Sequence, residues 1–266
     1  EFQRIYWAKN FLEFLKNLWK AWFYKWYIRS YRGNVSRKEL FSSMIKRSIP
    51  LPTDNQESFN KLVKALKIPE NTLIDAAVYA PKWQSFISEY LWWKWLDSAI
   101  WWMHAHTKTS SYVEENSELE SEVAKYSSID IQDFKDWAVD KDWFLQAYKE
   151  LWKAHFEMVY ESAKYVSEWN GHRRARLYAD VILWDLKIRE VTVKVKEKRD
   201  QDYLRVYWLV PLSKTTPEKD LLSRYEYLQQ FKKESKEFGS MKQASEALAL
   251  RIAMENLARN AGYKDP

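Results

Sequence analysis

The chain has 266 residues, 46% of them hydrophobic and 30% charged, with a formal net charge of +6. This size and composition allow the core of one large or two small globular domains. The chain has no cysteine, which excludes disulfides, thiolate metal sites and cysteine nucleophiles and fits a reducing compartment, the cytoplasm. Lysines interrupt even the most aromatic stretch, so we expect no membrane-spanning helix.

The first predicted helix covers residues 1–31, because apolar residues from Phe11 to Trp22 recur at spacings of three and four. The first fifty residues hold eleven Lys or Arg against three Asp or Glu. That balance attracts anionic partners, although a solvated helix face is its commoner explanation. The prolines of the stretch from Pro50 to Asn55 predict a loop and a boundary.

Between this loop and residue 142, the sequence predicts paired helices and an acidic insert. The predicted helices, separated by short turns, cover residues 59–66, 69–80, 83–91 and 96–106. Residues 112–142 hold ten Asp or Glu against three Lys, and we expect them to form a surface insert.

The remainder of the chain is predicted as further helices. Residues 143–168 read as one long amphipathic helix that stops at Asn170-Gly171, and another covers residues 173–183. Alternating valines favour a strand in residues 188–199, but the charged residues there favour a helix, which is our prediction. A loop framed by prolines precedes two last helices at residues 221–238 and 241–261.

A dozen successive helices predict an all-α fold, a helical array resembling HEAT-type solenoids with short irregular inserts. We divide the array into a basic aromatic segment 1–50, a segment 51–142 with the acidic insert, and a segment 143–266. We expect these segments to form one continuous array. Because the chain lacks an initiator Met and a tail at its end, we also expect it to be a fragment of a longer protein.

Tryptophan and glycine occur in inverted proportion. The chain has 16 Trp and 4 Gly, whereas about 7% glycine is usual in globular proteins. One hypothesis is that many of these tryptophans are UGA codons in an organism that reads UGA as glycine. The alternative is an aromatic-rich domain, in which the cluster of Trp92, Trp93 and Trp95 is a candidate binding surface.

A set of motifs in a fixed order resembles a known group of proteins. The motifs are Tyr79-Ala80-Pro81-Lys82-Trp83, residues 97–107, residues 170–180 with Asn170-Gly171-His172-Arg173-Arg174-Ala175-Arg176, residues 197–200, Leu209-Val210-Pro211-Leu212, residues 238–240 and residues 256–263. Together they resemble the large bacterial proteins of the molybdate-metabolism-regulator type, of the DUF5724/DUF4132 kind.

The resemblance implies an internal segment of a long, mainly helical bacterial protein, and it implies no reaction. Some relatives of that type carry a WGR module associated with nucleic-acid proteins. The pattern of the family has glycine near five of the tryptophans here, namely Trp92, Trp95, Trp169, Trp184 and Trp208. If these positions hold tryptophan in the native protein, helix ends that favour a left-handed cap carry a bulky residue.

The strongest candidate site is formed by His172, Arg173, Arg174 and Arg176 after the turn at Asn170-Gly171. Backbone N–H groups at a helix start and nearby arginines can bind phosphate or another anion. The alternative is that these arginines pair with Asp180, with Glu168 or with carboxylates of the acidic insert.

Metal and cofactor sites have little support in the sequence. His104 and His106 are spaced by two, whereas a metal-binding pair on a helix prefers a spacing of four, and phosphate-loop and hydrolase motifs are absent. We therefore predict no cofactor and no metal.

The sequence favours an uncharacterised helical scaffold or interaction module that binds a protein or an anionic partner. Two alternatives stay open: an enzyme with a polar site around His172, and a nucleic-acid-binding module.

Overall fold

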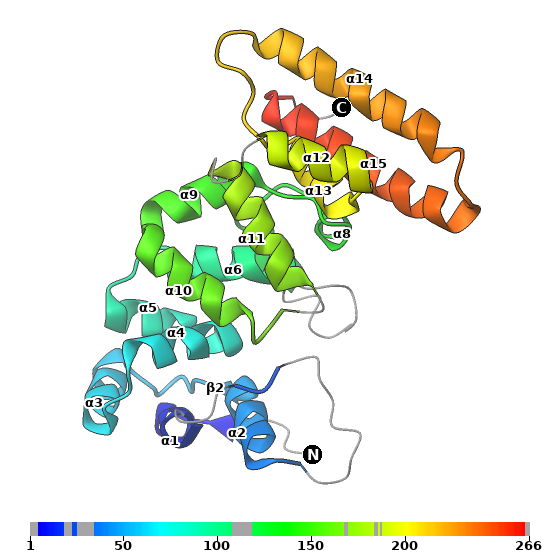
Figure 1. Cartoon of the computed structure of the whole chain (residues 1–266). Helices are drawn as coiled ribbons and strands as arrows, with labels where there is room; N and C mark the ends of the chain where they lie inside the picture. The colour runs from blue at the N-terminus through cyan, green and yellow to red at the C-terminus, as the bar shows by residue number, and fades with distance from the viewer. Residues whose placement is uncertain are drawn as a thin grey trace. The chain divides into compact units, whose positions relative to one another are not determined.

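The computed structural model describes residues 5–18, 23–25, 35–107, 119–167, 170–183, 186 and 188–263. Over these residues the fold is all-α, as predicted (Figure 1). The β-structure found there is one parallel pair of two-residue strands, β1 (Ile5–Tyr6) and β2 (Ser48–Ile49). No described helix is both long enough and apolar enough to cross a membrane.

The chain forms two compact units that interleave in sequence. The first unit comprises Glu1–Lys108 and Phe144–His172, and the second comprises Thr109–Trp143 and Arg173–Pro266. The predicted boundaries at residues 50 and 142, and the solenoid arrangement, stay predictions.

The first unit packs its helices around aromatic side chains. Its elements are α1 (Ala8–Leu18), α2 (Arg37–Lys46), α3 (Gln56–Leu66), α4 (Glu70–Tyr79), the 3-10 helix η1 (Pro81–Trp83), α5 (Gln84–Leu91), α6 (Leu96–Thr107) and α10 (Lys153–Ala163). Helix α10 packs against α4 and α6. Trp83 is fully buried, stacks on Phe11 at 4.4 Å, and donates its indole N–H to Ser48 Oγ at 2.9 Å.

The second unit is built around the last helix. Its elements are α8 (Ile131–Lys135), α11 (Gly171–Ile182) from Arg173 onward, α12 (Ile188–Lys198), α13 (Gln201–Tyr207), α14 (Pro217–Ser235) and α15 (Ser240–Asn260). Figure 1 shows α14 and α15 as two long neighbouring helices, and α13 also packs on α15. The segment at 188–199, ambiguous in sequence, is helical over α12, as predicted.

Two predicted helices are shorter than expected. The predicted helix 1–31 includes α1, but residues 5–6 form a strand and residues 23–25 are not helical, while residues 1–4, 19–22 and 26–31 lie outside the described part. The predicted helix 143–168 is two helices, α9 (Lys141–Leu151) and α10. The break occurs at Trp152, whose φ of 67° and ψ of 153° cannot belong to a right-handed helix.

The acidic segment is not simply a surface insert. Residues 119–142 are described, and they bury Val123 and Phe134 in the second unit. Two of its carboxylates, those of Asp133 and Asp136, accept hydrogen bonds from Arg251 at 2.8 and 2.7 Å. The excess of acids therefore serves in part to hold α15, a role that composition alone does not reveal.

Candidate functional site

Gly171 begins α11 because the helix start lies against the backbone at the end of α6. A Cβ atom at residue 171 would overlap the carbonyl oxygen of Thr107 and lie 2.8 Å from its carbonyl carbon. Only glycine permits this close approach. The predicted role of this glycine was to expose N–H groups to an anion. Its observed neighbour is instead a carbonyl oxygen, whose partial negative charge disfavours an anion at that point.

His172 is held within the first unit by Tyr160. Its Nε2 donates to the carbonyl oxygen of Tyr160 at 2.8 Å, and the two rings stack at 4.2 Å. Burial lowers the pKa of His172, an effect that the bond to this carbonyl opposes. The imidazole therefore joins α11 to α10 in its neutral form, with Nε2 already engaged.

Three arginines of the second unit surround one carboxylate. Arg174 Nε lies 2.7 Å from Asp202, Arg205 lies at 3.7 Å and Arg173 at 3.9 Å. Arg174 also stacks over the ring of Trp137 at 3.8 Å. We call these three arginines with Asp202 the arginine cluster. The cluster itself carries three positive charges and one negative charge, a surplus of two, and the carboxylate of Asp136 also interacts electrostatically with Arg205.

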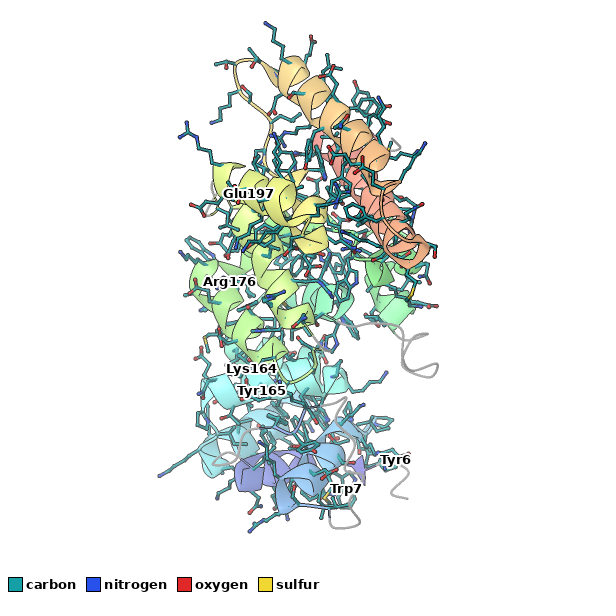
Figure 2. All side chains as sticks on the ribbon, turned by 45° about the vertical axis from the view of Figure 1, so that its right-hand side comes forward. Tyr6, Trp7, Lys164, Tyr165, Arg176 and Glu197 are labelled. Atoms are coloured by element: carbon teal, nitrogen blue, oxygen red, sulfur yellow. The ribbon has the colours of Figure 1, made fainter. Side chains whose placement is uncertain are left out.

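The members of the cluster differ in accessibility. The side chain of Arg173 is 75% exposed, whereas those of Arg174 and Arg205 are 19% and 7% exposed. Arg176 has a different carboxylate partner, Asp180, at 2.9 Å on the same helix. Figure 2 labels Arg176 on α11. Of the predicted arginines, the structure thus brings Arg173 and Arg174 to a common carboxylate.

Sequence reasoning missed Arg205 as a member of this cluster. It did not single out Asp202 either, and neither residue stands in a motif with Arg174. Asp200 caps α13 through hydrogen bonds to the amides of Asp202 and Tyr203. Asp202 and Arg205 then share one face of that helix, since they are three residues apart. Nothing in the sequence shows that this face meets α11.

The three candidate surface aromatics of the first unit do not form one exposed group. Trp92 is 89% exposed and Trp95 is 37% exposed, but Trp93 is only 7% exposed. Trp93 stacks on His155 at 3.7 Å. Its burial removes it from the candidate surface.

The two histidines of α6 are part of the core. His104 Nε2 lies 2.9 Å from the carbonyl oxygen of Val78, and His106 Nδ1 lies 2.8 Å from that of Trp102. Burial lowers the pKa of His106 to about 3. Among the described residues, no group of three or more His, Cys, Asp or Glu side chains could hold a metal ion.

The first unit also contains a partly polar cavity of about 700 Å³ between α1, α4 and α10. On one wall, Ser162 donates a hydrogen bond of 2.7 Å to Asp75, whose pKa is raised by burial. Tyr165, labelled with Lys164 in Figure 2, lines the same cavity, and burial also raises its pKa. The volume suits a small ligand, but the Ser162 hydroxyl already binds Oδ1 of Asp75. The sequence held no signal for this pairing across 87 positions.

Several motif residues of the second unit have structural roles. The guanidinium of Arg199 donates to both carboxylate oxygens of Glu246, at 3.1 and 2.8 Å, and to Glu234 at 2.8 Å. The amide of Asn260 donates to the carbonyl oxygens of Trp208 and Val210 at 2.8 and 2.9 Å. These contacts hold helix ends and the loop after α13 in place. They explain why arginine and asparagine occur at positions 199 and 260 without a ligand.

Comparison with known proteins identifies a family but no activity. No curated protein and no solved structure matches the chain. The family of unknown function DUF5724 matches it over residues 1–266. The chain therefore belongs to the DUF5724 family.

Proposed function

We propose that this chain is a helical interaction module that binds an acidic protein segment at the arginine cluster. The observation that carries the proposal is the surplus of two positive charges around Asp202, with the Arg173 side chain 75% exposed. A carboxylate that approaches Arg173 is attracted by this surplus. It competes with Asp202, whose carboxylate lies as far as 3.9 Å from Arg173.

Arg174, a mostly buried member of the cluster, is held in place before a partner arrives. Asp202 and the ring of Trp137 hold the guanidinium of Arg174 on two sides. Arginine offers a planar set of donors that matches a carboxylate, and an arginine whose position is already restricted loses less freedom on binding. The cluster is therefore suited to one or two carboxylates presented together.

The small size of the cluster favours an acidic protein over a nucleic acid. Proteins that bind duplex DNA commonly neutralise about 6 to 10 phosphates, whereas the cluster has three arginines and one of its charges is balanced by Asp202. For the enzyme alternative, the ring of His172 gives no support, since Tyr160 engages both of its nitrogens: the carbonyl oxygen lies 2.8 Å from Nε2 and the hydroxyl lies 3.4 Å from Nδ1.

The proposal also includes the finer features that the sequence indicates. In it, the module is part of a larger bacterial protein in the cytoplasm, of the molybdate-metabolism-regulator type, and its helices form a solenoid-like array. The all-α fold supports the helical array, and the motif resemblance and the absence of cysteine support the other features.

The test uses fluorescence anisotropy with three labelled probes: an oligoglutamate peptide, a single-stranded oligonucleotide and a duplex. We expect the peptide to bind, and Arg173→Glu to weaken binding at least about tenfold, because it reverses the charge at the exposed position. The matched control is Lys233→Glu, which makes the same charge change at an exposed position of α14.

Equal losses in the two variants would show general charge attraction and overturn the proposal, as would no binding of the peptide. Tighter binding of an oligonucleotide, with an affinity that falls steeply with salt, would establish the nucleic-acid alternative instead.

A further inference from the structure

Tryptophan is concentrated where the backbone is left-handed. Among the described residues, seven that are not glycine have positive φ, and five of them are tryptophans: Trp7, Trp92, Trp95, Trp137 and Trp152. The other two are Lys67 and Arg199. The chain contains 43 Lys and Arg but only 16 Trp, so chance would favour the basic residues at such positions. A bulky side chain at positive φ is a genuine outlier.

The described tryptophans fall into two groups. The five with positive φ are exposed, or intermediate in the case of Trp137, and Trp92 and Trp152 are 89% and 76% exposed. The other six are at most 7% exposed, and they are Trp83, Trp93, Trp101, Trp102, Trp143 and Trp208. The buried group is typical of tryptophan in a hydrophobic core. The other group has backbone angles that favour glycine, and its indoles are not buried in the core.

Two of the five tryptophans end a helix in the way that a real glycine does. After α15, the amides of Gly262 and Tyr263 donate to the carbonyl oxygens three and five residues earlier, and Gly262 has a φ of 87°. Trp92 with Trp93 after α5, and Trp137 with Ala138 after α8, make the same two bonds. This is the Schellman motif, in which glycine is the usual residue at the left-handed position. Lys67 makes these bonds as well, so other residues can occupy the position.

Trp152 provides the strongest single observation. Its φ of 67° and ψ of 153° lie in a region that is essentially restricted to glycine. Its carbonyl accepts the first hydrogen bond of α10, from Phe156 at 2.9 Å. Trp7 and Trp95 likewise precede α1 and α6 and accept the first bond of each helix. Glycine is common at this N-cap position, and tryptophan is not among the preferred residues.

We propose that Trp7, Trp92, Trp95, Trp137 and Trp152 are glycines in the native protein, encoded by UGA codons that the source organism reads as glycine. The structure both refines and extends the expectation from sequence. It supports Trp92 and Trp95, and it adds three positions. Trp169 and Trp184 lie outside the described residues. At Trp208 the expectation of a left-handed cap is wrong, because that residue is right-handed at a φ of −83° and fully buried.

The first test reads the codons of the source gene and measures the masses of the peptides of the native protein. We expect UGA at the five positions, peptides with glycine there, and a tRNA for glycine that reads UGA. Trp83 is the control, with UGG expected, because its indole N–H bonds Ser48 and its ring stacks on Phe11. UGG codons at the five positions, or peptides that carry tryptophan there, would overturn the proposal.

A second test uses recombinant chains and does not depend on the gene. Trp152→Gly should raise the thermal midpoint, since it relieves a backbone conformation that only glycine adopts freely. Trp83→Gly is the matched control and should lower the midpoint, because it empties the core of the first unit. A lower midpoint for Trp152→Gly, at unchanged helix content, would contradict the assignment at that position.

Discussion

Lowering the pH should destabilise the first unit through His106. This side chain is fully buried in α6, and burial lowers its pKa to about 3 from the usual 6.5. The unfolded chain therefore binds a proton below pH 6.5 that the folded chain does not bind. The contribution of His106 is fully present above pH 6.5, decreases as the pH falls, and reaches its lowest value below about pH 3.

The size of this effect follows from the difference between the two pKa values. One pKa unit corresponds to about 1.4 kcal/mol, so the 1.5 units between 6.5 and pH 5 cost about 2 kcal/mol. That is a large part of a typical stability of about 5 to 15 kcal/mol. Urea unfolding of the wild type and of His106→Asn, followed by circular dichroism from pH 7.5 to pH 4.5, measures the effect.

In the wild type, Nδ1 of His106 lies 2.8 Å from the carbonyl oxygen of Trp102. The asparagine variant places an amide N–H near this position, and the asparagine amide does not titrate. The difference in free energy of unfolding between wild type and variant should therefore shrink by about 2 kcal/mol between pH 7.5 and pH 5. Thr107→Val, a neighbouring buried substitution without a titratable group, should leave the pH slope unchanged. A constant difference between wild type and His106→Asn would refute the reasoning.

Three further predictions concern packing and buried charge. Asp75→Asn should raise the urea midpoint at pH 7, because burial raises the pKa of Asp75 and disfavours its charged form. This advantage should disappear as the pH falls below 4. A difference in urea midpoint between variant and wild type that is the same at both pH values would contradict the prediction. Gly171→Ala should cost about 3 kcal/mol, because its Cβ meets a backbone carbonyl, whereas Gly239→Ala, with open space around its Cβ, should cost at most about 1 kcal/mol; equal losses in chemical denaturation would sink this contrast. Glu246→Gln should cost about 3 kcal/mol by leaving Arg199 without its main carboxylate, a loss that calorimetry detects and that Arg199→Met in the same chain should partly reverse.

Most helices were predictable because their signals are local. The apolar spacing from Phe59 to Leu66 and the proline at position 69 correctly placed α3 and the start of α4. The charged residues of 188–198 correctly outweighed the alternating valines. The break at Trp152 was missed for a local reason too. Tryptophan carries no breaker signal, whereas a glycine at that position would have divided the predicted helix.

The candidate site was less predictable because it depends on contacts between distant segments. The sequence singled out Arg174, but its partner Asp202 lies 28 positions later and belongs to another helix. The need for Gly171 arises from Thr107, which is 64 positions earlier. The spacing of residues within a single helix does not predict contacts between distant segments.

The two proposals bear on each other through the exposed aromatic surface. If Trp7, Trp92, Trp95 and Trp152 are glycines, the most exposed indoles among the described residues of the first unit do not exist in the native protein. A binding surface built on those rings then disappears, whereas Arg173, Arg205 and Asp202 of the arginine cluster are unaffected. Trp137 is the exception, because its ring packs on Arg174 at 3.8 Å. A glycine there would free one face of that guanidinium. Of the two contacts that restrict Arg174, the one with Asp202 would remain, so Trp137→Gly should weaken rather than strengthen binding of the oligoglutamate probe.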